Sequence, residues 1–480
     1  MLEKEQLEEI LSIALSKAGD FADIYLEKKK VNGIICEEDK LERVISGHDV
    51  GAGIRVVSGE ATAYAYTNDL SMASLKEVAK VVSRGAKGSK KDLVLDLRKL
   101  ESSSTFSIKK RPEEVKMEEK AELVKEANQT ARSIDSRIKQ VTVSYADSVQ
   151  TVLIANSEGN ITEDERVRTR FVVNSIAAQG QDMQTGFESA GAFMGMELFQ
   201  MYDPREIATL ATKRALLMLE ARSAPSGKMP VVLAGEAGGT MIHEACGHGL
   251  EADLAQKGLS VYANKKGEQV ASSLVTVIDD ATMGNYYGSY LYDDEGVKAQ
   301  KNVLIEKGEL KGYLQDRLTA VQEKTQPTGN GRRESFQHRP LPRMSNTYLA
   351  AGDAEPEEII KQTKRGILVK RMGGGQVNTA NGDYMFEVSE GYLIENGEVT
   401  RPVRGATLTG NGPETLQLVD IVGNDVGFKI GTCGKDGQGA PVTSGQPTMF
   451  IRELIVGGQE IQDEGTSLRE VLLLPYWKRK

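Results

Sequence analysis

The sequence predicts an α+β fold with two domains, the first over residues 1–224 and the second over residues 225–480. A chain of 480 residues is too long for one ordinary hydrophobic core. The first part alternates amphipathic helices with short alternating segments, which is typical of helices packed on a largely antiparallel sheet. The second part is dominated by short β segments and Gly/Asn turns. Between them, residues 223–228 (SAPSGK) have the composition of a linker.

The first domain is expected to contain four amphipathic helices and several short strands. Apolar residues recur with helical spacing between Leu7 and Ala18, just before Gly19. Further helices are expected at residues 72–83, 116–133 (after Pro112) and 203–221. Strands are expected at residues 22–27, 33–36, 53–58, 61–66, 93–97, 141–145, 151–155 and 167–175. The lysine clusters at residues 28–30 and 90–91 are predicted to be solvated loops.

The second domain is expected to be rich in β structure. A strand over residues 229–233 and a glycine-rich turn over residues 235–239 precede a helix predicted at residues 240–255. Two hairpins are expected later in the chain. They join residues 303–305 to 310–314 and residues 391–394 to 398–402.

Composition limits the functional classes. The net charge of −9 argues against a large nucleic-acid-binding face, which needs concentrated Lys and Arg. The N-terminus has no apolar signal core, and no apolar run approaches the roughly 18 residues that span a bilayer. Cys36, Cys246 and Cys433 are too few and too scattered for a disulfide framework. We therefore expect a cytoplasmic protein with reduced thiols, in which a cysteine is available to bind metal.

The helix predicted at residues 240–255 carries two of the four histidines, His243 and His248, with Glu244 between them. Two imidazoles can bind a divalent metal, and a neighbouring carboxylate can accept a proton from water that the metal activates. The spacing HExxxH is one residue longer than the familiar HExxH. On an ideal helix such a pair diverges by about 140°, against about 40° for the shorter spacing. The helix must therefore be distorted, and Gly247 is where we expect a bulge or a helix end.

The residues alone leave the third metal ligand open. The candidates are Cys246, Glu251, Asp253, His338 and Cys433. A bulge that brings the two histidines together would turn Cys246 away, so a packed core role is favoured for it. An acidic helix face is the commoner explanation for Glu251 and Asp253. His338 lies in a polar segment, and Cys433 lies in a glycine-rich run predicted to be a loop that leaves its thiolate accessible.

The second domain resembles the TldD side of the TldD/PmbA family of metallopeptidases. The matching segments are residues 243–251 (HEACGHGLE), 293–296 (DDEG), 329–333 (GNGRR), 342–348 (PRMSNTY), 390–397 (EGYLIENG), 423–425 (GND) and 433–438 (CGKDGQ). These segments occur in order between about residues 229 and 457. The first domain resembles the family in length and element order rather than by sharp motifs. Ser345 stands where the pattern favours Thr, a change without chemical consequence.

The resemblance implies a Zn²⁺ site formed by His243, His248 and Cys433, with Glu244 as the catalytic carboxylate. It implies a peptidase that processes short peptides and degrades unfolded or small regulatory proteins. It also implies dimers, either of two identical chains or with a PmbA-like paralogue that lacks the metal motif. An older association of the family with DNA gyrase would then be indirect, since neither nucleic-acid nor membrane binding is expected here.

Substrate contacts and two rival functions complete the expectations. His338, Arg332 and Arg343 are candidates for binding substrate, and these three and Arg333 are candidates for stabilising the developing oxyanion. One rival function is a zinc amidohydrolase acting on small non-peptide amides. The other is a non-catalytic assembly subunit with a structural metal, although structural zinc sites are usually closed by four protein ligands.

Overall fold

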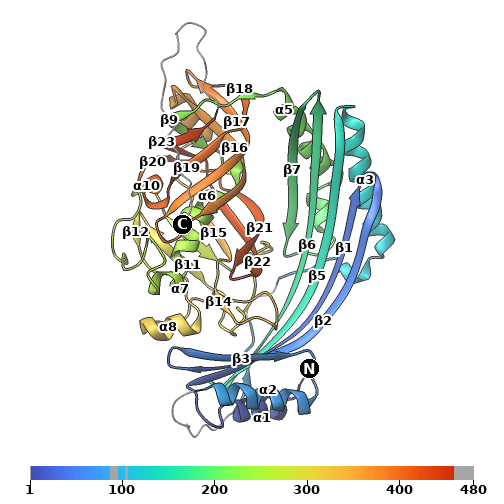
Figure 1. Ribbon diagram of the computed structural model, residues 1–480, viewed down its shortest axis with the longest axis vertical. Helices are drawn as coiled ribbons and strands as arrows, with labels where there is room; N and C mark the ends of the chain where they lie inside the picture. Colours follow the sequence, from blue (N-terminus) through green and yellow to red (C-terminus); the bar gives the residue numbers. More distant parts are fainter. Residues whose placement is uncertain (1, 87–95, 103–105, 459–480) are drawn as a thin grey trace, which may run out of the picture.

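A computed structural model describes residues 2–86, 96–102 and 106–458, and it has the predicted α+β architecture. A long curved sheet with helices forms the N-terminal part, and a β-rich body with short helices forms the C-terminal part (Figure 1). Within the described ranges, every helix is too short or too polar to cross a bilayer.

The N-terminal sheet has seven strands in the order β3-β2-β1-β5-β6-β4, with β7 beside β6. All neighbouring strands are antiparallel except the short β4, which runs parallel to β6. The strands are β1 (Phe21–Glu37), β2 (Lys40–Ser58), β3 (Ala61–Thr67), β4 (Arg98–Lys99), β5 (Ile138–Asn156), β6 (Asn160–Gln179) and β7 (Asp182–Ala192).

Several predicted strands prove to be parts of longer ones. The segments at residues 22–27 and 33–36 both belong to β1, which continues through the lysine cluster at residues 28–30. The loop predicted for this cluster is therefore wrong, because all three lysines pair in register with both β2 and β5. Their side chains still reach solvent, and interstrand pairing on both sides keeps the backbone extended despite the local polarity. The second lysine cluster, at residues 90–91, lies outside the described residues.

Helices cover the sheet at two places along its length (Figure 1). Helices α1 (Lys4–Ala14) and α2 (Met72–Gly85) pack on one end through a cluster that includes Leu7, Ile24 and Ile54. Helices α3 (Met117–Ile134) and α5 (Pro204–Glu220) pack further along through a cluster that includes Val124 and Phe171. The four helices predicted in this domain are confirmed within a few residues at each end, and a 3₁₀ turn at Pro112–Glu114 precedes α3.

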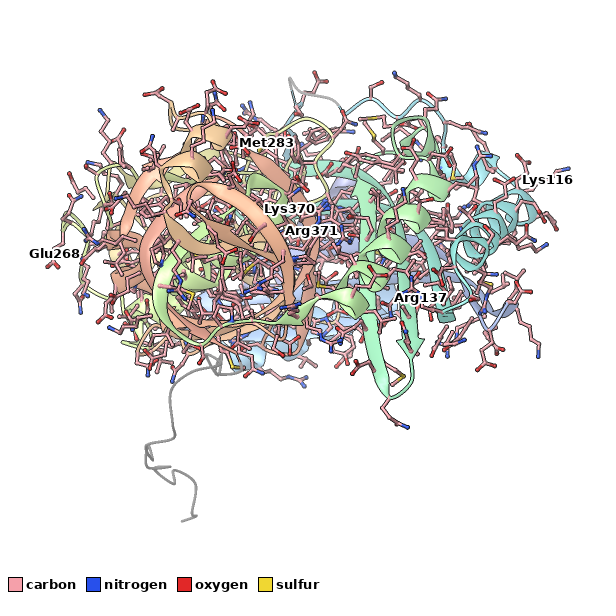
Figure 2. The ribbon with its side chains drawn as sticks, turned by 90° about the horizontal axis from the view of Figure 1, so that it is seen from above. Lys116, Arg137, Glu268, Met283, Lys370 and Arg371 are labelled. Carbon is pink, nitrogen blue, oxygen red and sulfur yellow. The ribbon has the colours of Figure 1, made fainter. Side chains whose placement is uncertain are left out.

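The C-terminal part contains a closed ring of strands. The order β16-β9-β23-β19-β17 returns to its start because β17 also pairs with β16, while β18, β8 and β20 extend this sheet. The strands are β8 (Arg222–Ser223), β9 (Gly227–Leu233), β16 (Arg365–Val377), β17 (Asp383–Glu395), β18 (Glu398–Arg404), β19 (Thr407–Asn411), β20 (Val419–Val422) and β23 (Met449–Gly457). Seen from above, the ring lies on one side of the molecule, and the helix that follows Lys116 lies on the other (Figure 2).

A second C-terminal sheet has the order β12-β11-β10-β15-β22-β21. Its strands are β10 (Val277–Asp280), β11 (Lys301–Glu306), β12 (Glu309–Leu310), β15 (Asn346–Leu349), β21 (Gly427–Lys435) and β22 (Gln438–Gln446). Both predicted hairpins are present, as β11–β12 and β17–β18, although β12 is much shorter than predicted.

The hydrophobic clusters follow the two parts of the chain. The two largest N-terminal clusters draw on residues 7–219, and the largest cluster of all draws on residues 224–456. This last cluster includes Met241, Ile242 and Leu250, together with residues from the closed ring of strands such as Phe386 on β17. The segment with the histidine motif is therefore packed into the main core of the C-terminal part.

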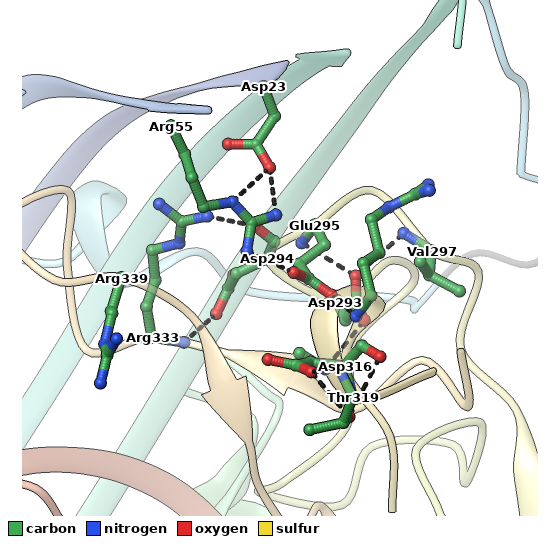
Figure 3. A network of polar contacts seen from close by, with 12 residues as sticks. Asp23, Arg55, Asp293, Asp294, Glu295, Val297, Asp316, Thr319, Arg333 and Arg339 are labelled. Carbon is green, nitrogen blue, oxygen red and sulfur yellow. Dashed lines mark hydrogen bonds and ion pairs between the residues drawn. The ribbon is translucent and has the colours of Figure 1, made fainter. Parts of the chain in front are cut away.

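A buried polar joint connects the two parts (Figure 3). Arg55 on β2 pairs with Asp23 on β1 and, at 2.6 Å, with Glu295 from the C-terminal part. Arg166 on β6 bonds Asp294 at 2.7 Å. These side chains are almost completely buried, so each charge has lost its water and is compensated by an opposite charge.

Candidate metal centre

The motif segment is not one regular helix. It divides into α6 (Thr240–Ile242), a π-helical turn (His243–Gly247), a 3₁₀ turn (His248–Leu250) and, after Glu251 in extended conformation, α7 (Ala252–Gln256). The irregularity predicted near Gly247 is thus confirmed. The backbone N–H of His248 donates to the carbonyl of His243, an i→i+5 bond that brings residues five apart onto one face.

The π-helical turn directs both imidazoles to one place. The ring centroids of His243 and His248 lie 4.9 Å apart, with the rings nearly perpendicular at 88°. The Sγ atom of Cys433 lies 3.5 Å from Nε2 of His248. One donor atom from each of these three residues lies within 4.8 Å of the others. The structure therefore brings together the three residues named from the sequence as metal ligands.

Gly247 lets the distorted segment pack closely. A Cβ atom at this position would lie 2.2 Å from Sδ of Met344, far inside contact distance. The position therefore has room for glycine only, unless the neighbouring methionine moves. Gly247 thus has a packing role beside the conformational one that the sequence indicated.

Cys433 lies on a strand rather than on the predicted loop, which corrects that expectation. It belongs to β21, which forms a hairpin with β22 through Asp436 and Gly437. Both turn residues have positive φ, 50° and 74°, as a two-residue type I′ turn requires. The guanidinium of Arg343 donates to the Cys433 carbonyl at 2.5 Å and so helps to hold this part of β21 in place.

The two cysteines near the motif have opposite environments. Cys246 is fully buried in the apolar core, and burial raises the pKa of its thiol to about 12. Burial also raises the pKa of Cys433, but hydrogen bonds and charge from His243 and His248 outweigh it and lower that pKa to about 5. Cys433 is therefore a thiolate at neutral pH, the form that binds metal, whereas Cys246 is a core residue.

Glu251 contacts the far side of His248 and does not join the three donors. Its Oε2 lies 3.1 Å from Nδ1 of His248, which leaves Nε2 directed toward Cys433. Burial alone would raise the pKa of Glu251, but the nearby ammonium of Lys435 and the charge of His248 lower it to about 2. An ionised carboxylate on the second nitrogen is the arrangement that orients metal-binding histidines. The sequence analysis missed this role, although the i+3 spacing from His248 was a usable signal.

The donor set fits a zinc-like divalent ion. Nδ1 of His243 is buried and has no hydrogen-bond partner within the described part of the chain. Two imidazoles and a thiolate are the nitrogen and sulfur donors that zinc prefers. A bound ion would use the electron pairs that the three side chains direct toward one another.

Glu244 and the three donors line one cleft of about 600 Å³. Glu244 is half-buried, and the cleft is bordered by β16 residues Gln376 and Val377 and by β21 from Lys429 to Lys435. β21 is the last strand of its sheet, so it has one edge without a partner strand among the described residues, and its residues line this cleft. An extended chain segment could reach Glu244 and the three donors along that edge.

The residues predicted to bind substrate lie elsewhere. His338 has Nδ1 at 3.1 Å from Oγ of Ser335, in the segment that docks against the N-terminal sheet. The guanidinium of Arg332 donates to backbone carbonyls, and that of Arg343 supports β21. None of the three lines the cleft, so the geometry gives their predicted contact with substrate no support.

Comparisons with known proteins agree over most of the chain. Residues 22–87, 110–219 and 226–458 match domain 1, the central domain and the C-terminal domain of the PmbA/TldA metallopeptidases. A metalloprotease TldD homolog of Haemophilus influenzae is 38% identical over 95% of this chain and 97% of its own length. A zinc metalloprotease TldD homolog of Saccharolobus solfataricus is 28% identical over 92% of this chain and 97% of its own.

Solved structures show the same fold. A candidate modulator of a DNA gyrase from Thermotoga maritima aligns with a TM-score of 0.78 at 24% identity, covering 95% of this chain and 100% of that one. TldE from Thermococcus kodakarensis aligns with a TM-score of 0.74 at 19% identity, covering 94% and 100%. Together with the domain matches and the identity to TldD homologs, these findings show that the chain belongs to the TldD/PmbA family of metallopeptidases.

Proposed function

We propose that this protein is a zinc-dependent peptidase that hydrolyses peptide bonds in unfolded or short peptides, including small regulatory proteins. The observation that carries the proposal is the convergence of His243, His248 and Cys433 beside Glu244 in one cleft. The printed names of the relatives support it, because they are called metalloproteases and one is called a zinc metalloprotease.

The chain's own residues would divide the chemistry as follows. Zinc, when bound by His243, His248 and Cys433, supplies a Lewis acid that polarises water and the substrate carbonyl. Glu244 takes the proton from the attacking water and delivers it to the leaving amine as the C–N bond breaks. Glu251 keeps His248 oriented through its second ring nitrogen. A thiolate donates more charge than a third imidazole would, which favours a modest rate.

The edge of β21 explains the preference for extended substrates. A peptide added beside this edge would pair through its main chain, the mode of recognition known as strand addition. Such pairing depends little on side-chain identity and requires an unfolded segment. Folded proteins would be excluded, because their strands already have partners.

The decisive test removes the carboxylate and keeps the metal. In Glu244→Gln, zinc content measured by mass spectrometry is expected to stay near that of the wild type, while turnover of a denatured protein or a peptide library falls by at least about 100-fold. The exposed Glu398→Gln serves as the control and keeps full activity. Undiminished turnover in a zinc-loaded Glu244→Gln protein would refute the mechanism.

The same assay separates the two rival functions. A zinc amidohydrolase would cleave small non-peptide amides faster than it cleaves peptides. An assembly subunit with a structural metal would bind zinc and cleave neither class of substrate. The proposed peptidase cleaves peptides, and unfolded chains faster than folded ones.

The proposal includes a dimer and a cytoplasmic location. The partner is either a second copy or a PmbA-like chain without the metal motif. The three unpaired cysteines agree with a reducing compartment. Light scattering after gel filtration, with the chain alone and mixed with a PmbA-like paralogue, measures which dimer forms. A monomer under both conditions would contradict this part of the proposal.

A further inference from the structure

A second cavity lies between the β21–β22 hairpin and the N-terminal sheet. It has a volume of about 300 Å³ and is enclosed by strands β1, β5 and β6 of the N-terminal sheet and by the β21–β22 hairpin. Thr432, the residue before Cys433, lines both this cavity and the metal cleft. No residue of the metal centre itself lines it.

Two buried arginines at this cavity have no carboxylate partner among the residues that the structure describes. Arg168 donates to the backbone carbonyls of Tyr287 and Ser289, both at 2.8 Å. Arg332 donates to the backbone carbonyls of Met344 and Pro441. Each arginine is at most 5% exposed, and neither forms an ion pair within the described ranges. These bonds use two of the five N–H groups that each guanidinium carries, and they leave the positive charges in place.

The remaining charges at the cavity do not cancel this excess. Arg166 is compensated by Asp164 and Asp294, and the cavity-lining Asp147 is engaged by Lys120 at 2.6 Å. Glu334, which also lines the cavity, is exposed and accepts a bond from the Gly439 amide.

Further cations face the same space. The side chain of Arg333 lines the cavity, and its Nε is buried without a partner in the described chain. Lys29 and Arg170 add two half-buried cations. Burial and, to a smaller extent, the neighbouring guanidiniums of Arg166 and Arg332 lower the pKa of Arg168 to about 9.

We propose that this cavity binds a small oxyanion, that is, a phosphate or a carboxylate group. Planar guanidinium groups match the oxygens of both, and a desolvated cation is strongly stabilised by such a partner. A volume of about 300 Å³ is at the lower end for ligand sites and suits a small group. The group could be a free inorganic anion or a carboxylate of a peptide held in the neighbouring cleft.

The first test measures binding and needs no peptidase activity, so its outcome is independent of the proposed function. Thermal unfolding of the full chain is followed while inorganic phosphate is added, with sodium chloride at matched ionic strength as reference. We expect a saturable rise in Tm with phosphate and none with chloride.

Variants at the cavity locate the site. Lys29→Gln and Arg170→Gln change half-buried side chains and are expected to fold, but to need about tenfold more phosphate for the same shift. Lys139→Gln, an exposed lysine near the start of β5, is the matched control and keeps the wild-type response. Equal shifts with phosphate and chloride, or unchanged phosphate binding in both cavity variants, would overturn the proposal.

The source of the anion is decided with two peptides of one sequence, one ending in a carboxylate and one in an amide. If phosphate raises KM for the carboxylate peptide alone and Arg170→Gln removes this effect, the site holds a substrate carboxylate. If phosphate binds but leaves both KM values unchanged, the site holds a free anion. An equal rise in both values that Arg170→Gln does not alter would place phosphate in the metal cleft and contradict the proposal.

Discussion

The domain joint and the metal centre both bury ionisable side chains, but they combine them differently. In the joint, Arg55 lies between the carboxylates of Asp23 and Glu295, so opposite charges compensate each other (Figure 3). In the metal centre, three electron-pair donors from His243, His248 and Cys433 face one another. The charged groups of the joint are paired with each other and need no ligand, whereas the three side chains of the metal centre together offer donor atoms to a metal ion.

This difference separates a structural use of buried charge from a chemical one. Compensated pairs add little net stability, but they are costly to break, and they fix how two surfaces fit together. Converging metal-binding side chains keep this arrangement because the surrounding core positions them. Here that positioning comes from a π-helical turn, a hairpin and the Glu251 contact. We expect changes in the joint to alter stability and changes in the centre to alter metal binding.

The largest effect is expected in the joint. Arg55→Leu leaves the carboxylates of Asp23 and Glu295 buried without their shared cation, which should lower the free energy of unfolding by about 3–5 kcal/mol. Chemical denaturation measures this change, and zinc affinity should stay that of the wild type. Arg98→Leu, which removes an exposed ion pair with Asp96, is the control and should cost less than about 1 kcal/mol. Equal losses of stability in the two variants would show that the buried ion pairs of Arg55 cost no more to break than an exposed pair.

The next effect distinguishes the two cysteines of the C-terminal part. Cys433→Ser removes one of three donors and should weaken zinc binding by roughly 3 kcal/mol, more than a hundredfold, which is one ligand's share of typical zinc-binding energies. Cys246→Ala leaves the donors untouched and should change only stability, by about 1 kcal/mol. Competition with a zinc-binding dye measures both affinities. Unchanged affinity in Cys433→Ser would disprove its assignment as a ligand.

A smaller effect on zinc affinity is expected for Glu251, which contacts the ligand His248 but is not itself a ligand. Glu251→Gln weakens the contact that orients His248 and should reduce zinc affinity by about 10–100-fold. Asp253→Asn is the matched control, because Asp253 shares Lys435 with Glu251 but does not contact the histidine. The same competition assay applies to both variants. If they lose affinity equally, the effect belongs to Lys435 and not to the orientation of His248.

The sequence predicted those features of the metal centre that depend on residues close together in the chain better than those that depend on distant residues. The spacing of His243 and His248 required a distorted helix, and the π-helical turn supplies it. The hairpin of Cys433 was missed although Asp436-Gly437 is a strong signal for a two-residue turn, because the surrounding glycines were interpreted as a loop. The choice of Cys433 itself came from family resemblance, since ligands distant in the chain are brought together only by the fold.

Predictions that depend on contacts between distant parts of the chain were less accurate, because the sequence does not show which strands are neighbours. Lys28–Lys30 interrupt the hydrophobic pattern of β1, yet pairing with two neighbouring strands keeps them extended. Arg332 and Arg343 were expected to contact substrate because of their chemistry, but neither lines the metal cleft: Arg343 supports the backbone of β21, and Arg332 lines the second cavity and donates to the backbone of β22. Which partner a buried arginine meets depends on strand order, and the sequence does not show strand order.

The smallest predicted effect tests, through pH, the carboxyl group of Asp316, which caps helix α8 (Arg317–Glu323) beside the joint (Figure 3). Burial, and then the charge of Glu295, raises the pKa of Asp316 to about 7, so the folded protein binds this proton more tightly than the unfolded chain does. The resulting stability is fully present below about pH 4 and is lost as the pH rises through about 7. Asp316→Asn keeps the cap on the Thr319 amide but cannot ionise. Its unfolding free energy should therefore fall by about 1 kcal/mol less than that of the wild type between pH 6 and pH 8. The exposed Asp353→Asn should follow the wild type, and parallel curves for all three proteins would show that Asp316 does not titrate in this range.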